Sequence, residues 1–260
     1  MKAKKSLGQH FLNSEEALKS MVSNIDTKNT IVEIGPGTGN LTEYILKTGA
    51  NVIAIETDSR AIPILNNRFK DEIKEDKLKI IEGDILETDL SLITDASYEV
   101  IANIPYYISG AIFRHVFSSK KIAESITLLI QKEVAERIVS KDSKESILSL
   151  SIKAYGSPEY IMTVPAKDFD PAPRVDSAIL RVHNISRDFF IKNNIEESFF
   201  FNIIKTAFGQ KRKTLVNNLK NTFDKELINS ILEKNNLSKT TRPEEIEIDL
   251  WINIIRDLDN

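Results

Sequence analysis

Between residue 30 and about residue 183, short apolar runs alternate with amphipathic segments. The apolar runs are rich in β-branched residues, as is typical of buried strands. They lie at 30–34, 51–56, 78–83, 98–103 and 125–131. Helical patterns lie at 41–47, 60–69, 111–117, 133–139 and 147–154. The alternation indicates βαβ units around a mainly parallel sheet, so the expected fold class is α/β.

The pattern changes towards the carboxyl end. Two late strands are expected at 160–164 and 177–182. Residues 170–173 between them read Asp-Pro-Ala-Pro and predict a loop, because proline disrupts a helix interior. After residue 184 only helical patterns remain, and they lie at 197–208, 213–221, 225–235 and 245–258. We therefore expect two domains, one containing the sheet over 1–184 and a small all-helical one over 185–260.

Composition excludes several classes of protein. With 41% hydrophobic and 28% charged residues, the 260-residue chain is expected to be globular rather than disordered. The absence of cysteine excludes disulfides, cysteine-based zinc sites and a thiol nucleophile. Its three histidines are far apart in sequence, so no metal site is expected. No leader pattern and no apolar run near the roughly 20 residues that span a bilayer is present, which predicts a cytoplasmic protein without a membrane segment.

Three glycines lie directly after the first predicted strand. Gly35, Gly37 and Gly39 precede a predicted helix, where glycine permits positive φ and close approach of the backbone to a ligand. The spacing departs from the dinucleotide-binding fingerprint G-x-G-x-x-G, because Asn40 stands in the place of its last glycine. A nucleotide-dependent oxidoreductase is therefore the weaker alternative.

Two acidic residues follow the next two strands. Glu56 ends the second strand, 21 residues after Gly35, where a carboxylate can accept hydrogen bonds from both hydroxyls of a ribose. Asp84 follows the third strand and can accept from the exocyclic amine of an adenine. Each acid alone is equally consistent with a helix N-cap. Together with the glycine loop, they favour an adenosine-type cofactor.

The fourth predicted strand ends in Asn103-Ile104-Pro105-Tyr106. An aryl amine is a poor nucleophile, and using it requires acceptors that hold its hydrogens and orient its lone pair. The Asn103 side chain and the Ile104 carbonyl can do this, while Pro105 stiffens the turn. Tyr106 offers a flat face for a flipped base. Considered alone, the tetrapeptide favours a turn around a buried tyrosine. Its position at the end of a strand beyond the glycine loop favours the reactive segment instead.

The glycine loop, Glu56 and Asp84 resemble the S-adenosylmethionine-dependent methyltransferases, and the tetrapeptide resembles the motif of those that methylate amino groups of nucleic acids. The whole chain resembles the ribosomal RNA adenine N6-dimethyltransferases. The matching segments are SLGQHFL (6–12), EIGPGTG (33–39), GDIL (83–86), NIPYYIS (103–109), LLIQKEVAERIV (128–139), FDPAPRVDSAIL (169–180) and FGQKRKTLVNNL (208–219). This resemblance implies a Rossmann-like sheet and a helical C-terminal domain.

Two branches of this family are considered. PAPRVDSAIL and RKTLVNNL resemble the small-subunit branch, whereas the Erm branch, which methylates 23S rRNA, typically lacks the basic C-terminal block. The resemblance to the small-subunit branch implies S-adenosylmethionine as cofactor and dimethylation of two adjacent adenosines in the loop of a 3′-terminal hairpin of 16S rRNA. It also implies a role in small-subunit biogenesis, and we expect a monomer.

The resemblance also implies roles for individual residues. The implied cofactor-binding residues are His10, Leu12, Gly35, Gly37, Glu56, Asp84 and Asn103. His10 stands where the family usually has asparagine, and both can donate a hydrogen bond. Phe169 is expected to face the same pocket as Tyr106 and to enclose the target adenine with it; the alternative is a phenylalanine of the core.

The formal net charge of -3 by itself disfavours a nucleic-acid partner. Eight of the chain's 35 Lys and Arg residues, however, lie in two segments without acids, residues 1–14 and 205–220. Basic clusters bind phosphates with little sequence selectivity. The expected RNA-binding residues are Lys4, Lys5, Lys205, Lys211, Arg212 and Lys213. A non-catalytic role in ribosome assembly is a further alternative, compatible with catalysis.

Overall fold

The computed structural model describes residues 8–139 and 144–259. They form two compact units. The first contains the described residues of Met1–Glu136 and Ser157–Ile185, and the second those of Arg137–Gly156 and Ser186–Asn260. The predicted domain boundary after residue 184 lies one residue from the boundary between the units at Ile185. Residues 137–156, which were expected in the first domain, belong instead to the helical unit. The apolar face of that segment packs on helices much later in the chain, which its local pattern does not reveal.

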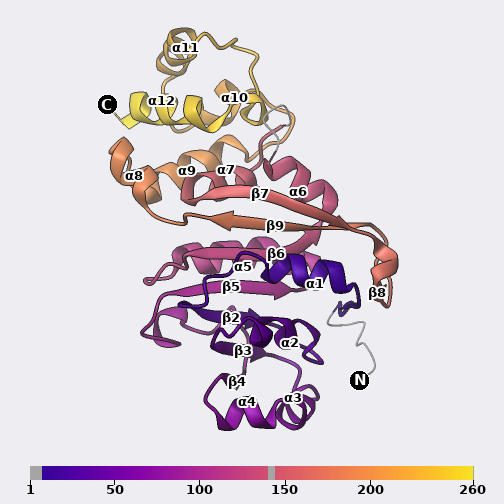
Figure 1. Cartoon of the computed structure of the whole chain (residues 1–260). Helices are drawn as coiled ribbons and strands as arrows, with labels where there is room; N and C mark the ends of the chain where they lie inside the picture. Colours follow the sequence, from indigo (N-terminus) through magenta and orange to yellow (C-terminus); the bar gives the residue numbers. More distant parts are fainter. Residues whose placement is uncertain (1–7, 140–143, 260) are drawn as a thin grey trace. The chain divides into compact units, whose positions relative to one another are not determined.

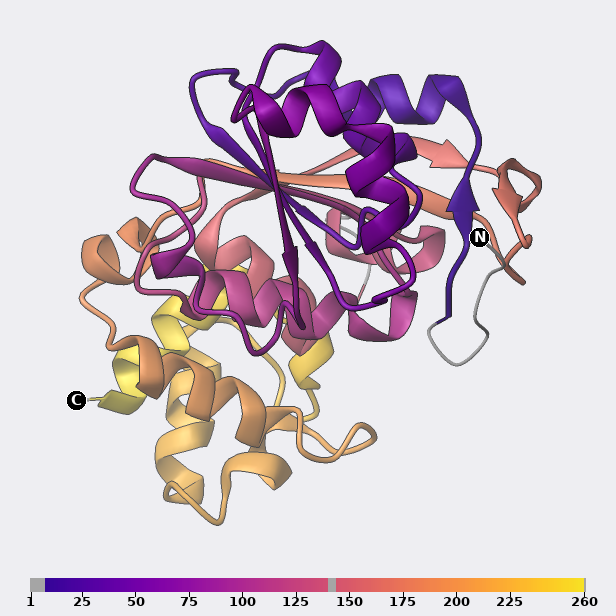
Figure 2. The same cartoon turned by 90° about the horizontal axis from the view of Figure 1, so that it is seen from below.

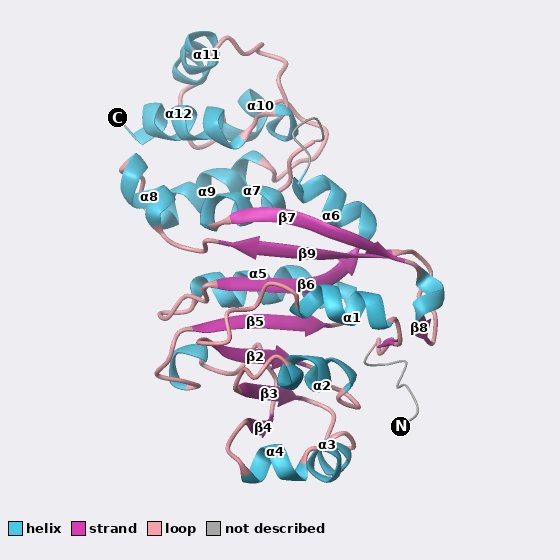
Figure 3. Ribbon diagram, viewed as in Figure 1, coloured by secondary structure: helices cyan, strands magenta, loops and turns pink. Residues whose placement is uncertain are grey.

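Seven strands form the sheet of the first unit, in the spatial order β4-β3-β2-β5-β6-β9-β7 (Figures 1 and 3). In chain order they are β2 (Thr30–Ile34), β3 (Val52–Glu56), β4 (Leu78–Glu82), β5 (Tyr98–Asn103), β6 (Ser125–Gln131), β7 (Ser157–Val164) and β9 (Ser177–His183). The strands from β4 to β6 pair in parallel, and β9 pairs antiparallel with both β6 and β7. All seven predicted strands and the α/β class are confirmed.

Helices cover both faces of this sheet, which is why its central strands are apolar on both sides. The early helices lie on one face and α5 on the other (Figure 2). The helices of this unit are α1 (Glu15–Val22), α2 (Asn40–Lys47), α3 (Ile62–Arg68), α4 (Lys70–Lys74), α5 (Ser109–Ser118) and the first part of α6 (Lys132–Val139). Met21, Ile45 and Leu65 bring α1, α2 and α3 into one buried cluster with the sheet.

A separate two-stranded sheet ties the start of the chain to the loop before β9. β1 (Phe11–Leu12) pairs antiparallel with β8 (Phe169–Asp170), with Leu12 opposite Phe169. Leu12 and Phe169 are both buried. The Asn40 side chain also donates to the Leu12 carbonyl at 3.2 Å. These contacts hold residues 8–12, which we call the N-terminal strap, beside the glycine loop.

The described residues of the second unit form helices joined by loops, with no strand among them. Its helices are the remainder of α6, α7 (Ile147–Tyr155), α8 (Asp188–Asn193), α9 (Glu197–Ala207), α10 (Leu215–Leu219), α11 (Lys225–Lys234) and α12 (Ile248–Asp259). Its core includes Tyr155, Phe190 and Phe200, whose rings pack edge to face. Helix α10 begins two residues later than predicted, because Thr214 caps it by accepting from the Asn217 amide. None of the helices in the described ranges is long and apolar enough to cross a bilayer.

Candidate active site

A cavity of about 250 Å³ opens at the carboxyl ends of the parallel strands. Open α/β sheets bind their ligands at this edge. The residues predicted to bind cofactor or target base all line it, although they come from six separate segments. They are His10, Leu12, Gly35, Gly37, Glu56, Asp84, Asn103, Ile104, Pro105, Tyr106 and Phe169.

The glycine loop needs its glycines for two reasons. Gly35, Gly37 and Gly39 have φ of 65°, 57° and 87°, the left-handed region that side chains disfavour. Space is also short, since a Cβ on Gly39 would lie 2.4 Å from the Phe69 ring. The Gly35 and Gly39 amides donate to the Ile55 and Pro36 carbonyls, so the loop is held by internal hydrogen bonds. Gly35 and Gly37 line the cavity without a side chain that would fill it.

Glu56 is buried at the floor of the cavity. Its Oε2 accepts from the Gly37 amide at 2.8 Å and its Oε1 accepts from the Asp58 amide at 2.7 Å. Burial raises the pKa of the Glu56 carboxyl, while the backbone donors oppose that rise. Each carboxylate oxygen can accept two hydrogen bonds, so both can still receive a ribose hydroxyl. The helix N-cap alternative fails here, because α3 begins only at Ile62.

Asp84 differs from Glu56 in its surroundings. Its side chain is exposed, and its Oδ1 accepts from the Leu86 amide at 2.9 Å. This bond closes a turn and starts no α-helix, so the N-cap alternative fails here too. One carboxylate oxygen is occupied by the turn, and the other is available at the cavity wall.

Two further acids were not predicted as site residues. Glu33 lines the cavity, is 1% exposed and accepts from the Thr42 hydroxyl at 2.6 Å. Burial raises the pKa of Glu33 to about 8, so this side chain is mostly protonated at neutral pH. Asp58 accepts from Gln9 Nε2 at 3.0 Å and from Arg60, and its ion pair with Arg60 holds its pKa well below the usual range. The feature of the sequence that could have identified Glu33 as a site residue is its position as an acid inside an otherwise apolar strand.

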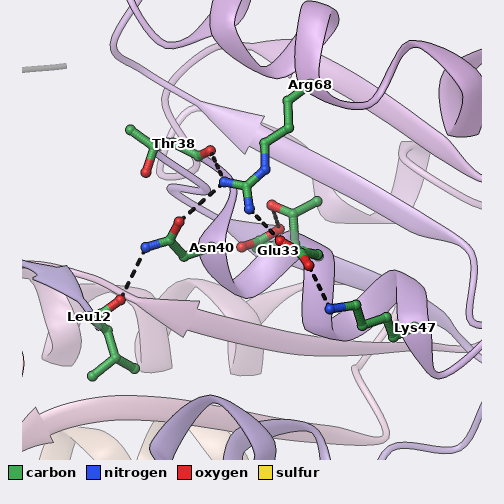
Figure 4. Close-up of polar contacts among 8 residues, drawn as sticks. Leu12, Glu33, Thr38, Asn40, Lys47 and Arg68 are labelled. Atoms are coloured by element: carbon green, nitrogen blue, oxygen red, sulfur yellow. Dashed lines mark hydrogen bonds and ion pairs between the residues drawn. The ribbon is translucent and has the colours of Figure 1, made fainter. Parts of the chain in front are cut away.

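A polar network holds the outer side of the glycine loop (Figure 4). Arg68 donates to the Thr38 carbonyl at 2.7 Å and to Asn40 Oδ1 at 3.1 Å. It also pairs with Glu43, which bonds Lys47 as well. Since Asn40 in turn donates to Leu12, the network connects the loop, α2 and the strap.

At the other end of the cavity, the Asn103 amide donates to the His10 carbonyl at 3.2 Å. This leaves Asn103 Oδ1 as an acceptor for a ligand. The Tyr106 hydroxyl bonds Ser177 Oγ at 2.6 Å, and burial raises the pKa of the phenol, which stays neutral. Tyr107, the next residue, is 72% exposed.

Phe169 is 5% exposed and forms part of the buried core cluster as well as of the cavity wall. Within the described ranges it makes no ring contact with Tyr106. The ring that lies beside Tyr106 is that of His10, with centroids 6.4 Å apart and planes inclined by 13°.

The predicted RNA-binding residues fall into two groups. Lys4 and Lys5 lie outside the described residues. Lys205, Lys211, Arg212 and Lys213 are all exposed, at the end of α9 and in the segment before α10. Among described residues, no group of three or more His, Cys, Asp or Glu side chains is arranged to hold a metal ion.

Comparison with known proteins shows the family and agrees with the fold. The ribosomal RNA adenine dimethylase family matches residues 1–260. Ribosomal RNA small subunit methyltransferase A of Fusobacterium nucleatum is 38% identical over 260 residues, covering 98% of this chain and 97% of its own. The protein of that name from Mycoplasma mobile is 37% identical over 254 residues and covers 95% of each chain.

Solved structures show the same architecture. A dimethyladenosine transferase from Plasmodium falciparum superposes with a TM-score of 0.78 at 25% identity, covering 96% of this chain and 98% of its own. The 23S rRNA methyltransferase ErmE gives a TM-score of 0.77 at 19% identity, covering 96% of this chain and 100% of its own, a likeness of fold alone.

The sheet, the glycine loop and the cavity at the strand ends define a Rossmann-like, S-adenosylmethionine-dependent methyltransferase. More narrowly, the chain belongs to the ribosomal RNA adenine dimethylase family. It is thus an rRNA adenine dimethyltransferase with S-adenosylmethionine as methyl donor.

Proposed function

We propose that this enzyme dimethylates the N6 amines of two adjacent adenosines in the loop of a 3′-terminal hairpin of 16S rRNA. It acts in the cytoplasm, as a monomer, during small-subunit biogenesis. The observation that carries the proposal is that Asn103 and Tyr106 share one cavity with the glycine loop, Glu56 and Asp84. The names of the relatives at 38% and 37% identity support the small subunit as the substrate.

The cofactor site fits S-adenosylmethionine. Glu56 would accept hydrogen bonds from the ribose hydroxyls, and Asp84 from the adenine amine. Gly35 and Gly37 leave room for the remaining part of the cofactor. His10, Leu12 and Asn103 would close the site from the strap side. The cofactor supplies an electrophilic methyl group on a sulfonium centre.

The residues at the other end of the cavity act by positioning. Asn103 Oδ1 and the Ile104 carbonyl accept the two amine hydrogens and turn the nitrogen lone pair towards the cofactor end. Pro105 has φ of -56° and ψ of 135°, which aims the preceding carbonyl before the turn of Tyr106–Ile108 begins. Tyr106 supplies a stacking face. No strong base is required, because the nitrogen loses its proton only after its positive charge develops.

RNA would be held by Lys205, Lys211, Arg212 and Lys213 through phosphate contacts, together with Lys4 and Lys5. Replacing Lys211, Arg212 and Lys213 by alanine should weaken small-subunit binding and reduce its salt dependence, by about one unit of log–log slope for each lost contact. Lys225→Ala, an exposed lysine between Asp224 and Glu226, is the control. If binding survives unchanged in the triple variant, this assignment of the RNA site is wrong.

The function is tested with labelled S-adenosylmethionine and small subunits from a methylation-deficient strain, followed by mapping of the modified bases. We expect label on two adjacent adenosines of 16S rRNA. Asn103→Ala should lower the rate by about 100-fold or more, because it removes a positioning acceptor. Asn29→Ala is a matched control, since its amide donates to Glu99 away from the cavity. Label on large-subunit RNA would favour the Erm-type alternative, and full activity of Asn103→Ala would refute the mechanism.

A further inference from the structure

The segment between α9 and α10 carries the densest positive charge of the helical unit. Residues 209–213 are all exposed, belong to no helix or strand, and read Lys-Arg-Lys at 211–213. We call 209–213 the basic turn. Among the described residues its three cations form no ion pair, whereas Lys234 of the same unit pairs with Asp257 at 2.7 Å. Three adjacent unpaired cations repel one another and attract an external anion.

Both ends of the basic turn are anchored in the helical unit. Before it, the Phe208 ring lies beside the ring of the fully buried Trp251, with 6.2 Å between the centroids. After it, the Leu215 amide donates to the Thr241 carbonyl at 2.9 Å. These contacts fix where the turn starts and ends, but they leave the path of the chain between the two ends undetermined.

The path of the turn is fixed by Asn218, a residue of α10 (Figure 1). Its side chain is 9% exposed, and its amide donates to the Ala207 carbonyl at 2.5 Å and to the Gln210 carbonyl at 3.3 Å. Carbonyl oxygens only accept, so the NH2 group must face them. The Gln210 carbonyl also accepts from the Lys213 amide at 3.0 Å. One side chain therefore joins the end of α9, the basic turn and α10.

Hydrogen bonds satisfy only half of the Asn218 amide. Its Oδ1 is buried and has no hydrogen-bond partner in the part of the chain that the structure describes. A buried acceptor without a partner lowers the stability of the folded state, which offsets much of what the two donated bonds contribute. The main effect of Asn218 is then to fix the conformation of the turn rather than to stabilise the unit.

We propose that Asn218 is a positioning residue for RNA binding, which holds the basic turn in its phosphate-binding conformation before the RNA arrives. The inference rests on the proposed function, because it takes the basic turn as a contact of the RNA. A turn that is already ordered loses little conformational entropy on binding, so the affinity is higher for the same number of phosphate contacts. Since Asn218 is buried, it acts only through the turn.

The test compares Asn218→Ala with Asn235→Ala. The Asn235 side chain donates to the Ile231 carbonyl at 2.8 Å, so the control breaks a bond of the same kind at the end of α11. Binding to undermethylated small subunits is measured over a range of KCl concentrations. Asn218→Ala should bind about tenfold more weakly with an unchanged log–log salt slope, because the same phosphates are contacted once the turn is ordered. Asn235→Ala should bind as the wild type does.

Methylation kinetics give a second readout. In Asn218→Ala the KM for small subunits should rise by about tenfold while kcat stays unchanged, as expected when binding alone is weakened. A loss of folded enzyme would lower kcat instead.

Trypsin, which cleaves after lysine and arginine, gives a readout that needs no RNA. Cleavage within 211–213 follows the population of molecules in which the turn is open. Asn218→Ala should be cleaved there several-fold faster than the wild type, and Asn235→Ala should not.

Unchanged affinity or unchanged cleavage in Asn218→Ala would overturn the proposal. An equal loss in Asn235→Ala would do so too, because the effect would then be one of stability. So would a salt slope reduced as in the triple alanine variant of 211–213, because phosphate contacts would then be lost. Failure of the proposed function is a separate result: the wild-type enzyme would leave 16S rRNA unlabelled, while binding and cleavage would still decide the role of Asn218.

Discussion

The two ends of the cavity are built on different principles. At the cofactor end, Glu33 and Glu56 are 1% and 3% exposed, and backbone amides or a hydroxyl hold their oxygens. At the base end, Tyr106 is half-buried and Tyr107 is 72% exposed. A diffusible cofactor can be enclosed by preorganised polar groups, whereas a base attached to a large RNA needs open, flat surfaces. Substitutions at the two ends should accordingly affect different measurements.

The largest effect is expected from Glu56→Gln, which should weaken cofactor binding without weakening RNA binding. The amide nitrogen cannot accept from Gly37 or Asp58, so one backbone donor loses its partner and one ribose contact is lost. We expect cofactor affinity to fall by about 100-fold in calorimetry, consistent with about 3 kcal/mol for hydrogen bonds to a charged group. Binding of small subunits should stay within a few-fold of the wild type. An equal loss of both affinities would contradict the separation of the two ends.

A smaller effect is expected from Gly39→Ala, with Gly49→Ala as its control. Both glycines have φ near 90°, so both substitutions strain the backbone. Only at Gly39 would the added Cβ meet another group, the Phe69 ring, since nothing lies within 4 Å at Gly49. Gly39→Ala should therefore lower the free energy of unfolding by about 1–3 kcal/mol more than the control does in urea denaturation. If both variants lost the same free energy of unfolding, the Phe69 ring would have to move aside without a loss of stability.

A further expected effect is a pH dependence of stability due to Glu33. Its carboxyl keeps a proton in the folded protein up to about pH 8, whereas in the unfolded chain it releases that proton near pH 4.5. Because the folded state binds more protons in this window, the stability that Glu33 contributes falls as the pH rises from about 4.5 to 8. Glu33→Gln should flatten this part of the curve of unfolding free energy against pH, measured without cofactor. Glu43→Gln should not, since Lys47 and Arg68 lower the pKa of Glu43 instead. An unchanged curve in Glu33→Gln would contradict this pKa shift.

Much of the fold can be predicted from local pattern. The runs at 30–34 and 125–131 coincide with β2 and β6, because parallel strands covered on both faces are continuously apolar. The position of β9 between β6 and β7 cannot be predicted this way, since strand order depends on long-range pairing. Helices α1, α4 and α8 were not predicted. Helix α1 precedes the alternation of strands and helices, α4 has no buried residue, and α8 is a six-residue helix whose apolar side includes the exposed Ile191.

For the site residues too, some positions can be predicted from sequence and others cannot. Glu56, Asp84 and the glycine loop follow predicted strands, and the carboxyl ends of parallel strands share one edge, so their convergence can be predicted from sequence. The partners of the strap cannot. Nothing near His10 indicates that its ring meets Pro171 and Tyr106, which lie 161 and 96 residues further along the chain. Individual roles of the predicted site residues remain predictions.

The pairing of β1 with β8 has a consequence for the order in which the molecule is made. The strap leaves the ribosome before its partner strand, which follows more than 150 residues later. A growing chain that already carries the glycine loop and Tyr106 still lacks the hydrogen bonds that hold this wall in place. The binding site is therefore completed only after Asp170 and Pro171 have emerged.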